Sequence, residues 1–180
     1  WDEPLNKKQT KKIEEIKKII WQAFLKVHLK SRYKNYLGVL VDQQFGSDIL
    51  KQAQKLGVIT ILTTEKSGQK IFDFEYGSDF GRQIKKVKPD YAKVLVRYNP
   101  SNRNENIIQL KRLKKLNDFC KQNNYGFLFE LLVPATESQL RHFKSKLKYD
   151  QLSRPKYTAK AIEEIRNFGI EPDIWKLEAM

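Results

Sequence analysis

Residues 90–98 read Asp90-Tyr91-Ala92-Lys93-Val94-Leu95-Val96-Arg97-Tyr98, and Asn99-Pro100 ends the run. The stretch is apolar on both faces of an extended chain, except that Lys93 and Arg97 alternate onto one face. Strands that are apolar on both faces are typical of a parallel sheet covered by helices. This stretch therefore indicates a buried strand of an α/β protein with two basic side chains on one side.

Similar stretches recur along the chain, with helical patterns between them. The other expected strands are residues 36–41, 58–63, 126–133 and 173–177. The expected helices are residues 6–29, 48–56, 79–87, 104–122, 137–143 and 156–168, which carry apolar residues at helical spacing or begin and end at cap residues. We expect Gly46 to break the chain before the second helix and Ser47 to cap that helix. This alternation predicts a parallel sheet in an α/β fold.

Two architectures fit that alternation, an open doubly wound sheet and a (β/α)8 TIM barrel. The doubly wound sheet usually carries a glycine-rich ligand-binding turn, and the sequence has no dinucleotide fingerprint. Barrel enzymes carry catalytic residues at the carboxyl ends of several strands, and charged residues lie late or midway in these strands. We favour the barrel. Eight βα units usually take about 250 residues, so residues 1–180 are expected to form one domain truncated at both ends, with strands two to six present.

Composition narrows the class of protein. Lys and Arg total 35 against 21 Asp and Glu, a net charge of +14, but the lysines are scattered along helix surfaces without a nucleic-acid-binding signature. The single cysteine, Cys120, excludes a disulfide scaffold and a cysteine-based zinc site, and neither histidine has a ligand partner in sequence. We expect no metal and no cofactor. No signal peptide or membrane-spanning apolar run is evident, so a cytoplasmic location is expected.

Three charged residues lie inside apolar strands: Lys93, Glu130 and Lys176. An unpaired buried charge is costly, so charges on successive strands are expected to compensate one another. One interpretation is a structural ion-pair network. The other is a Schiff-base site, in which a desolvated lysine attacks a ketone, a nearby cation lowers its pKa and a carboxylate transfers protons. We favour the second, because barrels held by packing alone use Val, Ile and Leu in these layers.

Six strings in the chain resemble one family. They are residues 38–46 (GVLVDQQFG), 65–69 (EKSGQ), 72–77 (FDFEYG), 93–100 (KVLVRYNP), 129–136 (FELLVPAT) and 175–178 (WKLE). They are similar to the aldolase-like domain of inositol catabolism, the 2-deoxy-5-keto-gluconate 6-phosphate aldolase family, which is often fused to a sugar kinase. Residues 13–180 carry this resemblance, and a more distant one is to class I tagatose-bisphosphate aldolase. Ala179 stands where the family usually has glycine.

The resemblance implies roles for individual residues. Lys176 on strand six would form the Schiff base, Glu130 on strand five would be the acid/base, and Lys93 on strand four would assist them. Substrate-binding roles fall on Asp42, Glu65, Lys66, Arg97 and Glu178. The loop 72–77 has two open interpretations, since it can line the mouth of the barrel or pack its aromatic residues over the rim.

The expected function is that of a class I aldolase, a lyase that cleaves a phosphorylated keto sugar acid such as 2-deoxy-5-keto-gluconate 6-phosphate. The alternative is a non-catalytic sugar-phosphate-binding or regulatory domain on the same fold. The expected partner is the small phosphorylated sugar, with no nucleic acid and no membrane. Open sheet edges would favour self-association, so a homo-oligomer is a further expectation, and the truncated piece alone is expected to be inactive.

Overall fold

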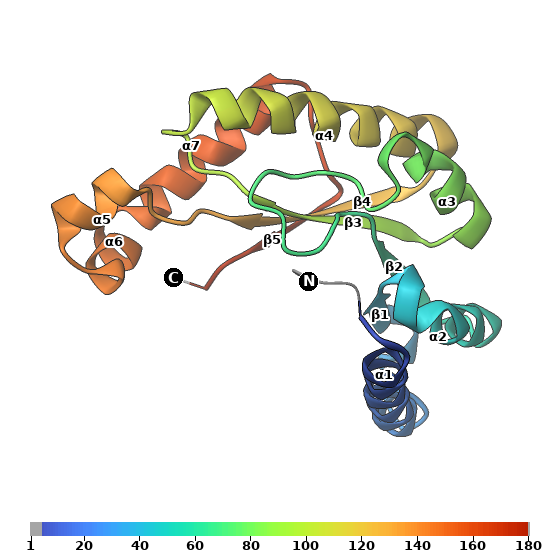
Figure 1. The fold of residues 1–180 in the computed structure, drawn as a ribbon. Coiled ribbons are helices and arrows are strands. Elements are labelled where there is room, and N and C mark those ends of the chain that lie inside the picture. Colours follow the sequence, from blue (N-terminus) through green and yellow to red (C-terminus); the bar gives the residue numbers. More distant parts are fainter. Residues whose placement is uncertain (1–4, 180) are drawn as a thin grey trace.

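The computed structural model describes residues 5–179, and its five strands form a single parallel sheet. The strands are β1 (Gly38–Val41), β2 (Ile59–Thr63), β3 (Tyr91–Arg97), β4 (Gly126–Leu132) and β5 (Ile174–Leu177) (Figure 1). All five expected strands are confirmed, with ends that differ by a few residues.

Seven α-helices are present among the described residues, one more than the sequence predicts. They are α1 (Lys7–His28), α2 (Gln43–Lys55), α3 (Phe80–Val87), α4 (Arg103–Asn123), α5 (Glu137–Phe143), α6 (Lys146–Leu152) and α7 (Arg154–Asn167), with short 3-10 turns at η1 (Lys34–Tyr36) and η2 (Gly77–Asp79). The unexpected helix is α6. Within residues 5–179, none of the helices combines the length and apolar character needed to cross a membrane.

The beginning of α2 differs from the prediction. Asp42 caps this helix, because its carboxylate accepts a hydrogen bond of 2.7 Å from the Phe45 backbone N–H. Gly46 therefore lies inside α2, in a non-helical conformation (φ −128°, ψ 15°), and does not separate the helix from β1. The expected break at Gly46 is present as a kink that joins two helical pieces of α2. The expected cap at Ser47 is wrong, because the helix begins before the kink, at Gln43, and Asp42 caps it.

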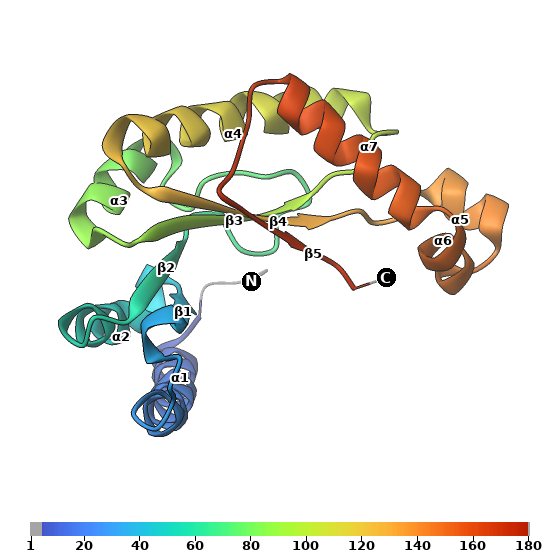
Figure 2. The same ribbon diagram turned by 180° about the vertical axis from the view of Figure 1, so that it is seen from behind.

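The strand order agrees better with a partial barrel than with a doubly wound sheet. Each strand pairs in parallel with the next one along the chain, so the described sheet contains no reversal of strand order. A doubly wound sheet reverses its order at a switch point and carries helices on both faces. Right-handed crossovers in sequential order place the helices on one side. Figures 1 and 2 show α3, α4 and α7 over one face of β3, β4 and β5, consistent with part of an α/β barrel.

The core lies between the sheet and these helices. Val94, Val96 and Phe129 point from the strands to this side and have no exposed surface. They belong to one cluster with Leu113 of α4 and Ile165 of α7, which are equally buried. Burial of each such side chain stabilises the fold by about 1.5–3 kcal/mol. The opposite face of β3 and β4 carries Lys93 and Glu130, so the charged residues are on the side that these helices leave uncovered.

Gly46 of α2 packs closely against Val41 of β1. A Cβ atom at this position would lie 1.9 Å from Val41 Cγ1. We expect Gly46→Ala to lower the free energy of unfolding by about 1–3 kcal/mol, because overpacking there must displace β1. Urea denaturation measures the loss, and Val41→Ala in the same chain should recover part of it through the space that it creates. An unchanged unfolding midpoint in Gly46→Ala would contradict this packing.

Candidate active site

Four charged side chains form a continuous series on the uncovered face of the sheet. Lys93 Nζ lies 2.6 Å from Glu65 Oε1 and 2.9 Å from Glu130 Oε2. The other Glu130 oxygen, Oε1, lies 2.5 Å from Lys176 Nζ. We call Glu65, Lys93, Glu130 and Lys176 the charge chain. Its signs alternate along its length, so each carboxylate contacts at least one ammonium group.

Strand register brings these residues together. Glu130 pairs directly with Lys176 across β4 and β5, and with Leu95 across β3 and β4. Lys93 lies two residues before Leu95, on the same face of β3. Its long side chain therefore reaches up to Glu130. The structure thus brings together the three residues to which the sequence assigned catalysis, while their chemical roles stay predictions.

Glu65 joins the charge chain from the loop that follows β2. An isolated antiparallel bridge between Glu65 and Phe74 folds this loop back on itself. The loop is anchored at Phe72, which is only 3% exposed. The Phe72 backbone N–H donates to Gln109 Oε1 at 2.8 Å, and the Phe72 backbone oxygen accepts from Arg112 Nη1 at 2.6 Å. The sequence assigned Glu65 to substrate binding, and its ion pair with Lys93 was not predicted.

The two carboxylates of the charge chain have opposite pKa shifts. Burial raises the pKa of Glu65 above its ordinary range, and this outweighs the attraction of Lys93. Burial acts the same way on Glu130, but the hydrogen bonds and charges of Lys176 and Lys93 outweigh it, so the pKa of Glu130 is lowered. The difference arises because Glu130 contacts two lysines and Glu65 contacts one. Glu130 is therefore ionised at rest, the form in which a carboxylate can accept a proton, and Glu65 takes up a proton at a higher pH than an ordinary glutamate does.

Lys176 is less enclosed than the sequence predicts. Its side chain is 57% exposed, whereas that of Lys93 is 4% exposed. The expectation of a desolvated Lys176 is wrong for this structure, because β5 is an edge strand of the described sheet and its inner face is uncovered. The amine is thus accessible to a ligand from solvent, and its ion-pair partner among residues 5–179 is Glu130.

Four residues assigned to substrate binding lie outside the charge chain, and two of them, Arg97 and Glu178, lie at the ends of β3 and β5. Arg97 is exposed at the end of β3, and its Nη1 donates to the Gln69 backbone oxygen at 3.2 Å. Glu178 accepts a 3.0 Å hydrogen bond from the Val133 backbone N–H and lies 3.2 Å from Arg154 Nη1. Glu178 therefore ties the end of β5 to β4 and α7. Arg97 remains available to an anionic ligand through its other nitrogens.

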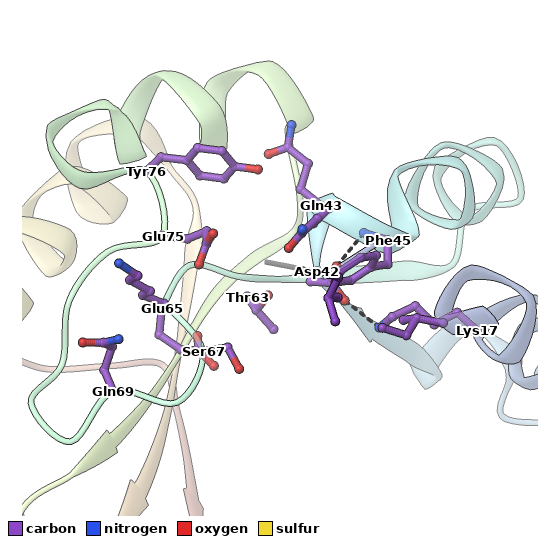
Figure 3. A pocket seen from close by; sticks show the side chains of 14 residues that line it. Lys17, Asp42, Gln43, Phe45, Thr63, Glu65, Ser67, Gln69, Glu75 and Tyr76 are labelled. Carbon is purple, nitrogen blue, oxygen red and sulfur yellow. Dashed lines mark hydrogen bonds and ion pairs between the residues drawn. The ribbon is translucent and has the colours of Figure 1, made fainter. Parts of the chain in front are cut away.

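The remaining predicted residues line a cavity of about 630 Å³ at the ends of β1 and β2 (Figure 3). Asp42 reaches it from the start of α2, where its carboxylate also lies 2.5 Å from Lys17 Nζ. Glu65 and Lys66 reach it from the loop after β2. The cavity therefore adjoins the charge chain at Glu65.

The same cavity contains residues that were not predicted to have a role. Gln43, Ser67, Gln69, Glu75 and Tyr76 contribute to its walls. Two signals could have indicated them: Gln43 follows Asp42 directly, and the loop 72–77 was one candidate for the mouth. In this loop Phe72 and Phe74 are buried in the core, while Glu75 and Tyr76 line the cavity. That the cavity is the mouth of a barrel stays a prediction.

The described residues offer no metal centre. Within residues 5–179, no three side chains of His, Cys, Asp or Glu are grouped so that they could hold a metal ion. Cys120 is buried in α4, and burial raises the pKa of its thiol to about 12, so it is an unreactive part of the core.

Comparison with models of known protein families finds a match that covers nearly the whole chain. The family described as "Uncharacterized protein conserved in bacteria (DUF2090)" matches residues 4–180. A search of curated proteins found no match to the chain.

Proposed function

We propose a function for this chain, which belongs to the bacterial family DUF2090: it is a class I aldolase, a carbon–carbon lyase whose substrate is a phosphorylated keto sugar acid. We take 2-deoxy-5-keto-gluconate 6-phosphate as the substrate to test first, on the resemblance of the motifs. The fold in this proposal is a (β/α)8 barrel in which β1 to β5 correspond to strands two to six. The observation that carries the proposal is the charge chain, which ends in an accessible amine.

The proposed reaction begins at Lys176. Glu130, 2.5 Å away, takes a proton from the ammonium group, and the free amine adds to the ketone carbon. Glu130 then returns the proton to the carbinolamine hydroxyl, which leaves as water and yields a protonated imine. Cleavage of the adjacent carbon–carbon bond sends its electron pair into an enamine, and the imine nitrogen becomes neutral. The hydroxyl of the departing fragment gives its proton to Glu130 and becomes the carbonyl of the aldehyde. Glu130 passes this proton to the enamine carbon, and water then hydrolyses the resulting imine, which releases the second fragment and frees Lys176.

Lys93 has a supporting role in this scheme. Its ammonium group contacts two carboxylates at hydrogen-bonding distance and is almost inaccessible. It is therefore poorly placed to attack a substrate. As a fixed cation it orients Glu130 toward Lys176 and keeps that carboxylate ionised. Arg97, exposed at the strand end, is the candidate for binding a carboxylate or phosphate of the substrate.

Borohydride reduction of the intact protein with candidate keto phosphates tests the proposal. Reduction converts a protein–substrate imine into a stable secondary amine, and peptide mass mapping should place the added mass on Lys176. Ligand binding without any trapped adduct would favour the second candidate, a non-catalytic sugar-phosphate-binding domain. The large exposed fraction of Lys176 is the observation that keeps this second candidate open.

Glu130→Gln separates proton transfer from binding. The amide keeps the shape of the side chain but cannot carry protons between Lys176 and the substrate. We expect turnover to fall by about 10²–10⁴-fold, while the substrate still binds.

Glu137→Gln is the matched control, because the Glu137 side chain is 92% exposed on α5. Steady-state and single-turnover rates provide the measurement. Equal turnover in Glu130→Gln and in the control would remove Glu130 from the mechanism.

A further inference from the structure

The cavity next to Glu65 has walls of a distinct chemical character. It is of the size that small-molecule sites usually have, and it is bounded by the ends of β1 and β2, the start of α2 and the loop after β2. Figure 3 shows Glu65, Ser67 and Gln69 on one side, Asp42 and Phe45 on the other, and Tyr76 pointing toward Gln43. Amides, hydroxyls and carboxylates therefore surround the space.

The charges around this cavity nearly cancel. Asp42 is paired with Lys17 inside the cavity wall, and Glu65 is paired with Lys93 behind it. Two charged lining residues remain, Lys66 and Glu75, which have no ion pair within residues 5–179 and opposite signs. A phosphate site would instead gather several Arg or Lys side chains or a series of backbone N–H donors. The cavity is thus poorly suited to the anionic end of a ligand.

The cavity wall has acceptor oxygens with unused hydrogen-bonding capacity. Gln43 Oε1 is fully buried and has no hydrogen-bond partner in the part of the chain that the structure describes. The second oxygen of Glu65, Oε2, accepts one hydrogen bond within residues 5–179, which comes from the Thr64 backbone N–H at 3.2 Å. Glu75 adds a carboxylate to the same walls. A ligand with several O–H groups would supply the missing donors, and its oxygens could accept from Lys66, Ser67 and Gln69.

We propose that this cavity binds the uncharged, hydroxyl-bearing carbon chain of a sugar or polyol, with the anionic groups of the ligand outside it. A hydroxyl in contact with Glu65 would adjoin the charge chain, because the same carboxylate holds Lys93. The identity of the reacting ligand rests on the proposed aldolase function. The recognition of hydroxyl groups by the cavity does not, since it follows from the walls alone.

Titration of the isotope-labelled full chain by NMR tests this inference. The probes are sorbitol as a neutral polyol and inorganic phosphate as an anion. Sorbitol at millimolar concentration should shift the backbone amide signals of residues 43–45, 63–69 and 75–76, and phosphate should leave them in place. Shifts caused by phosphate alone, or no shift with sorbitol, would overturn the inference.

Gln43→Leu is the diagnostic variant, because it removes the unpartnered acceptor at similar size. Sorbitol binding should weaken about 3- to 10-fold, the effect of one lost hydrogen bond. The control is Gln151→Leu, an exposed position on α6. Equal affinity in both variants would refute the role of Gln43. If sorbitol binds as expected but borohydride traps no keto phosphate, the aldolase proposal fails and the cavity inference stands.

Discussion

Lys176→Ala is expected to abolish both the borohydride-trapped adduct and turnover. No other lysine of the charge chain can replace the lost amine, because Lys93 is buried between two carboxylates. The substitution should leave the fold intact, since the Lys176 side chain is mostly exposed and its removal leaves Glu130 with Lys93 as a partner. Mass spectrometry of the reduced protein and an assay of aldehyde release measure the two losses.

Lys176→Arg tests whether the reaction needs a free amine at this position or only a positive charge. Arginine keeps a cation beside Glu130 but is not deprotonated in proteins, so it cannot form an imine. It should therefore be as inactive as Lys176→Ala while retaining the ion pair. The control is Lys156→Ala, an exposed lysine on α7. An active Lys176→Ala variant, or an adduct on another lysine, would rule out the proposed Schiff base.

Lys93→Met should have the largest effect on stability. Lys93 is the shared cation of Glu65 and Glu130, and removing one partner of a buried ion pair typically costs about 3–5 kcal/mol. Urea denaturation at pH 7 should show this loss. Lys111→Met, an exposed position on α4, is the control.

The loss in Lys93→Met should also depend on pH. Without the lysine, two carboxylates face one another, and proton uptake by the folded state relieves their repulsion. Glu65 should take up the proton first, because burial already raises its pKa. A group with a raised folded-state pKa binds protons more tightly in the folded state than in the unfolded state, so the deficit relative to wild type should shrink from pH 7 to pH 5. The same deficit at both pH values would show that the carboxylates are not the cause.

Much of the fold could be predicted, because local patterns decide it. Runs such as residues 90–98 are apolar on both faces, which identifies buried parallel strands. The cap of α2 was missed because Asp42 and Ser47 are both good cap residues, and the choice depends on how close Gly46 lets the helix approach Val41. The helix α6 was missed because Lys146–Leu152 has only one buried residue, Tyr149, and hence no apolar periodicity.

The part of the site that depends on the alternation of side chains along the strands could be predicted. Alternation along β3, β4 and β5 was enough to place Lys93, Glu130 and Lys176 on one face. Glu65 follows its strand in a loop, so its contact with Lys93 depends on the bridge to Phe74, which no local pattern shows. The exposure of Lys176 depends on which segments cover this face of the sheet. Glu178 lies outside the charge chain because it forms an ion pair with Arg154 of α7. Both are tertiary effects between distant segments.

The anchored loop after β2 affects how a ligand would bind. Phe72 and Phe74 fix the loop in the core, and the side chains of Gln109 and Arg112 hold the Phe72 backbone. The wall formed by residues 65–76 is therefore ordered before any ligand arrives. A ligand that enters this cavity loses its own freedom but does not have to immobilise the wall, which lowers the entropy cost of association. Preorganisation of this kind would let a small, uncharged polyol bind with measurable affinity through only a few hydrogen bonds.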